Sequence, residues 1–338
     1  MNSRERVSAA LRRTVPDRVP YCETGIDRAF AGRLMGWREQ ISQAANLEVN
    51  QFSVDEAKAI ARKLGTDNIS YVLRAPVYAE KHPGMDGRLF YGNGLIKTRA
   101  DLPMLQLPDP RNDSLYEEAE QFARNKGAYS AWFVTRVGIF PTWLSMGIER
   151  FSIALYDDRS FVEEVLDTYC DWAAVVAERA CQLGFDVFVS TDDMAFKTGP
   201  FFSPKVFREL VLPRFSLVAS NITLPWVVHS DGNIVPFLDD LVGLGISGIH
   251  PIEEGAMDIR AIKRDYGDKL CLLGNVDLNI LGNGSRSEVI RTVEGLIRDV
   301  GPGGGYIVTS GNSLAGYLRP ENVLAMSEAV KQYGRYPL

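Results

Sequence analysis

Short runs of apolar and β-branched residues recur eight times along this chain, and segments with a 3.6-residue apolar period separate most of them. The runs cover residues 18–23, 68–74, 129–140, 186–193, 225–232, 245–254, 269–277 and 304–312. Strands that alternate with helices favour a parallel sheet, and eight such strands fit a closed (β/α)8 barrel. The chain is therefore predicted to be an α/β protein of the TIM-barrel type.

The spacing of these runs is regular only after about residue 185, so additional segments are expected in the first half. Aromatic and β-branched residues around Gly92 and Gly94 predict a hairpin within residues 87–110 that lies over the barrel. No internal repeat and no long Pro-, Gly- or Ser-rich linker divides the chain. Residues 1–338 are therefore expected to form a single domain with a large core.

The charge balance and the cysteines limit the functions that fit the chain. With 37 basic and 43 acidic residues and no lysine- or arginine-rich block, a nucleic-acid partner is not expected. No apolar run approaches the ~18 residues that span a membrane, and no signal-type region begins the chain, so a cytoplasmic protein is expected. The four cysteines form no CxxC pair, which indicates reduced thiols and no thiolate-rich metal site.

One predicted strand end combines a histidine with a carboxylate. The run WVVHSDGN at residues 226–233 contains His229 and Asp231. Side chains two apart in a strand share a face, so these two present an imidazole and a carboxylate to one point, as a Zn²⁺ site would need. The alternative is a histidine that only caps the strand by bonding a neighbouring backbone group. The other two histidines have poorer contexts, since His82 lies in a polar loop and His250 within an apolar run.

Polar residues gather at the predicted carboxyl ends of the strands, where (β/α)8 barrels carry their functional sites. They are Glu23, Asp192, Asp193, His229, Asp231, Glu253, Glu254, Asn275, Asp277 and Asn312. A carboxylate at a strand end often caps the following helix, which explains one or two of these residues but not all of them. Several carboxylates that converge on one histidine favour a bound cation or a general acid or base. Lys197 follows Asp193 closely and can offset the negative charge or bind an anionic substrate.

A succession of short motifs resembles the uroporphyrinogen decarboxylase superfamily over nearly the whole chain. In chain order the motifs are DRVPYCE, TDDMAFKTGPFFSP, HSDGN, HPIEEGAMD, LLGNVD, GGYIVTSGN and RPENVLAM. The resemblance implies a (β/α)8 barrel, in agreement with the strand count. It also implies one of two kinds of enzyme, which are cofactor-free decarboxylases of haem synthesis and methyltransferases that use a corrinoid protein or coenzyme M.

The chain departs from two branches of this superfamily. The decarboxylases carry an arginine motif after the first strand and a histidine after the last, but this chain has Glu23 and Asn312 in those regions. The coenzyme M methyltransferases bind zinc through an HxC motif and a further cysteine. Here Asp231 takes the place of the first cysteine, and Asn312 falls near the second. The remaining similarity is to the corrinoid-dependent methyltransferases that resemble O-demethylases.

For this branch, the resemblance implies transfer of a methyl group from a small O- or N-methyl compound, for example a methoxylated aromatic, to a separate corrinoid protein. That partner would supply the cobalamin, because no histidine of this chain fits a DxHxxG motif. The expected catalytic residues are Asp193 and Lys197, which would orient the methyl donor and stabilise charge on the leaving group. The expected ligands of one divalent metal, zinc in the first place, are His229, Asp231 and Glu253. The expected substrate-binding residues are Glu23, Asn275, Asp277 and Asn312.

Two other functions also fit the sequence. A metal-free decarboxylase or lyase of the same superfamily could act on another carboxylic acid with Lys197 and the carboxylates. A non-catalytic ligand-binding barrel is the second alternative. The methyl donor, the metal and the oligomeric state stay open, with a homodimer as one candidate assembly.

Overall fold

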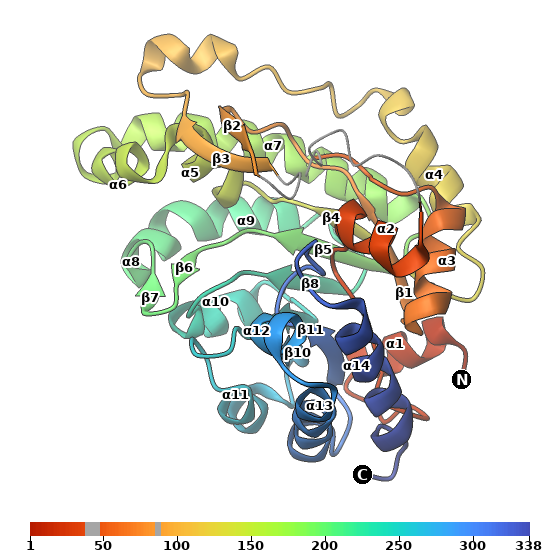
Figure 1. Cartoon of the computed structure of the whole chain (residues 1–338). Helices are drawn as coiled ribbons and strands as arrows, with labels where there is room; N and C mark the ends of the chain where they lie inside the picture. Colours follow the sequence, from red (N-terminus) through yellow and green to blue (C-terminus); the bar gives the residue numbers. More distant parts are fainter. Residues whose placement is uncertain (38–47, 85–88) are drawn as a thin grey trace.

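A parallel sheet of seven strands forms the centre of the computed structural model, which describes residues 1–37, 48–84 and 89–338 (Figure 1). The strand order is β1, β4, β5, β8, β9, β10, β11, and every neighbouring pair is parallel. The strands are β1 (Asn68–Val72), β4 (Ser130–Thr135), β5 (Val187–Thr191), β8 (Trp226–His229), β9 (Gly248–His250), β10 (Cys271–Val276) and β11 (Tyr306–Ser310). This α/β sheet of the TIM-barrel type confirms the predicted fold class.

The segment at residues 18–23 closes the gap between β11 and β1. Tyr21 forms an isolated parallel bridge with Val308 of β11, whose N donates to Pro20 O at 2.9 Å. On the other side, Asp67 N donates to Tyr21 O at 2.7 Å, beside the start of β1. The prediction of a full strand over residues 18–23 is wrong, because the segment forms only an isolated bridge, although it lies in the expected position in the barrel. Pro20 gives the physical reason, because proline has no N–H for a strand ladder.

Apolar side chains fill the barrel interior, and α1 (Ser3–Leu11) packs against its amino-terminal end. Val7, Ala10 and Leu11 of this helix contact interior strand residues that include Trp132 and Val187. The strand face that points inward is therefore apolar at this end. The polar residues of the sheet lie at the opposite, carboxyl end of the strands, which is where barrels of this type carry their functional sites.

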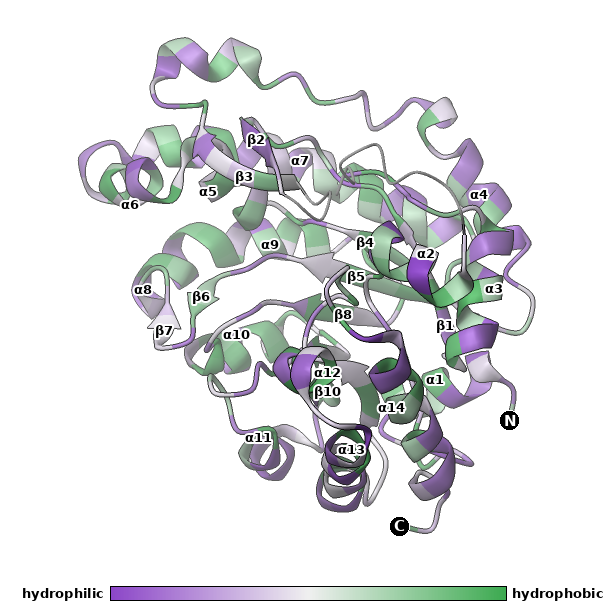
Figure 2. Cartoon of the chain, viewed as in Figure 1, coloured by the Kyte–Doolittle hydropathy of each residue, from purple (hydrophilic) through white to green (hydrophobic). Residues whose placement is uncertain are grey.

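Helices cover the outer face of the barrel, and Figure 2 shows hydrophilic colour on the outward faces of α13 (Arg286–Val300) and α14 (Pro320–Tyr333). Val289, Val293, Leu296 and Val300 of α13 are buried at the spacing of a single helical stripe. The other covering helices are α3 (Val54–Leu64), α4 (Glu117–Arg124), α7 (Arg159–Gln182), α9 (Leu212–Ala219), α10 (Leu238–Gly243) and α11 (Ile259–Tyr266). None of the helices within the described ranges is long and apolar enough to span a membrane.

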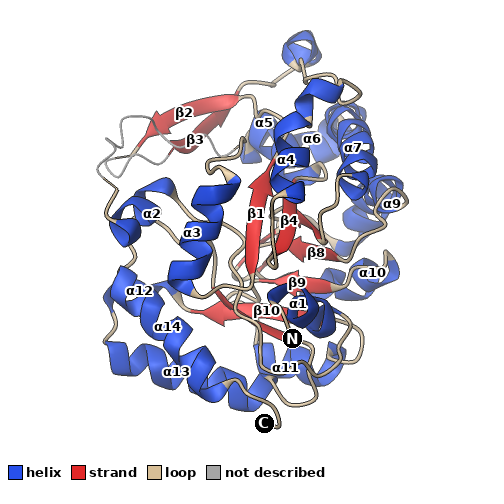
Figure 3. Ribbon diagram, turned by 90° about the vertical axis from the view of Figure 1, so that its right-hand side faces the viewer, coloured by secondary structure: helices blue, strands red, loops and turns tan. Residues whose placement is uncertain are grey.

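A β-hairpin and further short segments are present in the first half of the chain, but the predicted bounds of the hairpin are wrong. β2 (Ala79–Pro83) pairs antiparallel with β3 (Leu89–Gly94), so the hairpin begins before residue 87 and ends before residue 110. The sequence AEKHP of β2 is polar and exposed, which gives a weak strand signal. The hairpin lies beside α5 (Ile139–Met146) (Figure 3).

Shorter elements complete the description and connect the strands to the covering helices. They are α2 (Arg28–Met35), η1 (Arg99–Met104), η2 (Asp113–Leu115), α6 (Ile148–Asp157), β6 (Ala195–Phe196), β7 (Gly199–Pro200), α8 (Pro204–Val206), η3 (Phe207–Val211), η4 (Val235–Phe237) and α12 (Leu278–Asn283).

Candidate metal centre

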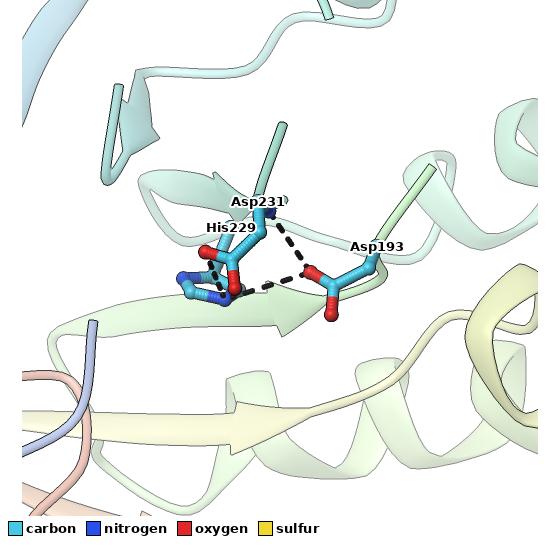
Figure 4. Close-up of side chains that lie close together, drawn as sticks. All are labelled: Asp193, His229 and Asp231. Atoms are coloured by element: carbon cyan, nitrogen blue, oxygen red, sulfur yellow. Dashed lines mark hydrogen bonds and ion pairs between the residues drawn. The ribbon is translucent and has the colours of Figure 1, made fainter. Parts of the chain in front are cut away.

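One histidine and two aspartates meet at the carboxyl end of the barrel (Figure 4). His229 is the last residue of β8, and its Nε2 lies 3.7 Å from Asp193 Oδ1 and 3.8 Å from Asp231 Oδ1. One ligand atom from each of the three residues lies within 4.8 Å of the other two. The side chains of His229 and Asp231 therefore do meet at one point, as the sequence predicts, although β8 ends at His229 and Asp231 lies in the following loop.

Backbone contacts hold the two loops that carry the aspartates against each other. Asp231 N donates to Asp193 Oδ1 at 2.9 Å, and Met194 N donates to Ser230 Oγ at 3.0 Å. Gly232 adopts a φ of +80°, and a Cβ there would lie 2.4 Å from Ala195 O. Glycine is required at this position, because any side chain would force the two loops apart.

The electrostatics of the cluster suit a cation. Burial, together with the negative charges of Asp193 and Glu253, raises the pKa of Asp231 to about 8. Asp231 Oδ2 accepts a hydrogen bond from Asn312 Nδ2 at 2.6 Å, but Oδ1 is buried and has no partner. Burial also lowers the pKa of His229, which favours the neutral imidazole that binds metals. A buried, unpaired carboxylate oxygen facing such a ring fits a divalent cation.

The structure places Glu253 beside this cluster, while Asp193 supplies the second carboxylate within it. Glu253 Oε2 accepts a hydrogen bond from Gly232 N at 2.8 Å, and Oε1 lies 3.2 Å from Lys197 Nζ. Both oxygens of Glu253 therefore already have partners. Lys197 is largely exposed, so its ammonium group stands at the rim, where it pairs with Glu253.

Three of the four residues predicted to bind substrate differ in their surroundings. Glu23 is 3% exposed, accepts from Ser310 Oγ at 2.5 Å and lines a cavity of about 100 Å³. Asn275 is buried, donates to Ile252 O at 2.7 Å and leaves its Oδ1 without a partner. Asn312 holds the carboxylate of Asp231.

Two of the strand-end carboxylates have structural contacts. Asp277 caps α12 and accepts from Asn279 N at 2.7 Å, so helix capping accounts for this residue. Asp192 is fully buried and accepts from the backbone N of Val137, Gly138 and Phe140. It thereby fixes the loop after β4.

Sequence reasoning missed His250, which lies in register with His229 on the neighbouring strand. The two Nδ1 atoms are 2.6 Å apart, so the side chain of His229 contacts another imidazole rather than the backbone group of the capping alternative. Burial lowers the pKa of His250 well below its usual value. A signal was present, because two histidines at the ends of adjacent parallel strands face the same interior.

Sequence reasoning also missed Arg136 and Arg74. Arg136 is 4% exposed, and its Nε and Nη1 atoms have no hydrogen-bond partner. Burial and the charge of Arg136 lower the pKa of Arg74 to about 9. The predicted strand over residues 129–140 concealed Arg136, because β4 ends at Thr135. These two guanidinium groups place positive charge near the acidic mouth.

Glu23 is expected to make stability depend on pH. Burial raises the pKa of this carboxyl from 4.5 to about 8, against the effect of hydrogen bonds from Ser310. The folded state therefore keeps a proton that the unfolded chain releases, so this contribution is full below pH 4.5 and is lost as the pH rises through about 8. Urea denaturation should show the parent losing stability over this window relative to Glu23→Gln. Parallel pH profiles for the two proteins would contradict this assignment.

The fold and the cluster together define a parallel α/β barrel with a candidate metal centre at the carboxyl ends of its strands. Residues 137–333 match the family model described as Uroporphyrinogen decarboxylase (URO-D), and the chain belongs to this family. No curated protein matches the sequence.

Two solved structures share the fold over nearly the whole chain. The chain is similar to a methyltransferase from Methanosarcina mazei, with 19% identity, a TM-score of 0.76, and coverage of 98% of this chain and 99% of that one. It is also similar to a B12-independent methionine synthase from Shewanella sp. W3-18-1, with 11% identity, a TM-score of 0.52, and coverage of 93% and 98%. At these identities the two likenesses establish the fold.

Proposed function

We propose that this chain is a metal-dependent methyltransferase that moves a methyl group from a small O- or N-methyl compound to the cobalt of a separate corrinoid protein. The observation that carries the proposal is the cluster of Asp193, His229 and Asp231, in which one buried carboxylate oxygen has no partner. The fold similarity to a protein named as a methyltransferase supports the same reaction class.

An imidazole with two carboxylates is a ligand set for Zn²⁺ or another borderline divalent cation. When bound, the cation would act as a Lewis acid on the heteroatom that bears the methyl group, and the partner's cobalt(I) corrinoid would take the methyl group. Asn312 fixes the orientation of Asp231 through its 2.6 Å hydrogen bond. Lys197, held at the rim by Glu253, would orient the methyl donor and offset negative charge on the departing heteroatom.

A second function is favoured by a specific observation. Arg136 is a buried guanidinium with two unpartnered nitrogen atoms, and it can bind a carboxylate on a substrate. A metal-free decarboxylase or lyase that acts on another carboxylic acid would use this feature. The two functions differ in their need for metal, which makes metal dependence the deciding property.

Replacing Asp193 with asparagine is expected to lower methyl transfer by about tenfold, because the variant loses one anionic ligand of the cation. The assay would follow methylation of free cob(I)alamin with a panel of methoxylated aromatics and methylamines. Asp55→Asn is the matched control, since Asp55 is exposed on α3. A rate within about threefold of the parent, less than about 0.7 kcal/mol on the barrier, would remove Asp193 from the site. Release of CO2 without metal would instead support the decarboxylase.

A further inference from the structure

His229 and His250 form a buried pair of imidazoles behind the candidate metal centre. They are 8% and 1% exposed, and their rings stack with centroids 4.8 Å apart and an interplanar angle of 29°. Their Nδ1 atoms are 2.6 Å apart, which is a hydrogen-bond distance. A neutral imidazole carries one N–H and one lone pair, so one Nδ1 must donate and the other must accept.

The direction of this hydrogen bond decides whether His229 can bind a metal. If His250 donates, the proton of His229 lies on Nε2, which is the atom that faces Asp193 and Asp231. An N–H in that position cannot coordinate a cation. If His229 donates from Nδ1, its Nε2 presents a lone pair to the space between the two carboxylates.

We infer that His250 is a positioning residue, which accepts the Nδ1 hydrogen bond of His229 and so selects the tautomer that binds metal. The inference rests on the metal site of the proposed function. In this arrangement the proton of His250 lies on its own Nε2. That atom is buried, and it has no hydrogen-bond partner among the described residues.

The use of a second histidine has a chemical consequence. A metal-bound histidine usually donates its other N–H to a carboxylate or a backbone carbonyl, groups that can only accept. An imidazole can either donate or accept, so the His229–His250 pair has two states of different metal affinity. Metal binding and a His250 that accepts the hydrogen bond must therefore both favour the state in which the proton of His229 lies on Nδ1.

Two substitutions at residue 250 separate an acceptor from simple packing. His250→Asn keeps an oxygen near the position of Nδ1, whereas His250→Leu fills similar space without an acceptor. Zn²⁺ affinity, measured by competition with a chromophoric chelator, should fall by about 10–100-fold in His250→Leu. It should stay within about threefold of the parent in His250→Asn. Thermal unfolding of the metal-free proteins would show that both variants fold, and His82→Leu on exposed β2 is the control.

The tautomer itself can be read from a long-range ¹H–¹⁵N spectrum of the imidazole rings. The chain has only three histidines, so the substitutions assign each ring. With Zn²⁺ bound, the proton of His229 is expected on Nδ1. A proton on Nε2 in the loaded protein, or parent-like Zn²⁺ affinity in a folded His250→Leu, would overturn the role of His250.

Failure of the metal site gives a different result from failure of this inference. If the parent binds no Zn²⁺, or if His229→Ala binds it as tightly as the parent, the metal site of the proposed function falls and the role of His250 falls with it. If only His229→Ala loses Zn²⁺ and His250→Leu does not, the metal site stands and the role of His250 alone is wrong.

Discussion

Replacing His229 with alanine is expected to lower the Zn²⁺ affinity by at least about a hundredfold, because groups that only contact a ligand already contribute 10–100-fold. His229 supplies the nitrogen of the Asp193–His229–Asp231 cluster, and its ring is 8% exposed at the end of β8. Alanine leaves two carboxylates whose mutual repulsion raises the pKa of Asp231, so protons compete better for that oxygen. When both proteins are purified without chelators, the parent should therefore contain bound metal and the His229→Ala variant should contain almost none.

Elemental analysis of the two proteins is the direct measurement, and methyl transfer to cob(I)alamin should fall in the same variant. His82→Ala is the matched control, because His82 lies on β2 with its side chain 63% exposed. Its metal content and rate should equal those of the parent. Equal metal contents in His229→Ala and the parent would exclude His229 as a ligand and would remove the main support for a metal-dependent reaction.

Part of this site can be predicted from the sequence because it depends on local geometry. His229 and Asp231 are two residues apart where an apolar run ends, so both lie at the same mouth, although β8 ends at His229 and Asp231 lies in the loop beyond it. Asp193 follows another apolar run, and the rule that barrel sites lie at carboxyl ends places it at the same mouth. The parallel sheet likewise follows from the alternation of strand and helix patterns.

The rest of the site depends on contacts between strands that no single run of residues encodes. His250 pairs with His229 because β8 and β9 align in that register, which the sequence of neither strand sets by itself. Glu253 is in the predicted loop, but its two oxygens bind Gly232 N and Lys197. Arg136 was hidden because nothing in the apolar run 129–140 marks the end of β4.

A buried ionic cluster, which the sequence analysis also did not identify, lies where the barrel closes. Asp67 is 1% exposed, and its Oδ1 accepts from Arg6 Nη1 at 2.6 Å and from Arg18 Nη2 at 2.9 Å. Its Oδ2 accepts from Tyr21 N at 3.0 Å, within the segment that lies between β11 and β1. One carboxylate therefore connects α1, the closing segment and the start of β1.

Replacing Asp67 with alanine is expected to lower the free energy of unfolding by about 3–5 kcal/mol, the usual cost of breaking a buried ion pair by removing one partner. Arg6 is 8% exposed and would keep only Asp17 and Met1 O as acceptors, and Tyr21 N would lose its acceptor. Asp55→Ala is the control, since Asp55 is 86% exposed and should contribute much less. The shift of the urea midpoint at an unchanged m-value would measure the difference.

The Asp67→Ala variant also tests how the closing segment supports the site. Glu23 ends this segment, and its N donates to Asn68 Oδ1 at 2.9 Å, so loosening of Tyr21 should reach Glu23. His229 lies at the end of β8, in a different part of the sheet. The metal affinity of the Asp67→Ala variant should therefore change far less than its free energy of unfolding. A loss below about 1 kcal/mol would show that the arginines find other partners and that the bridge between Tyr21 and Val308 is enough to close the barrel.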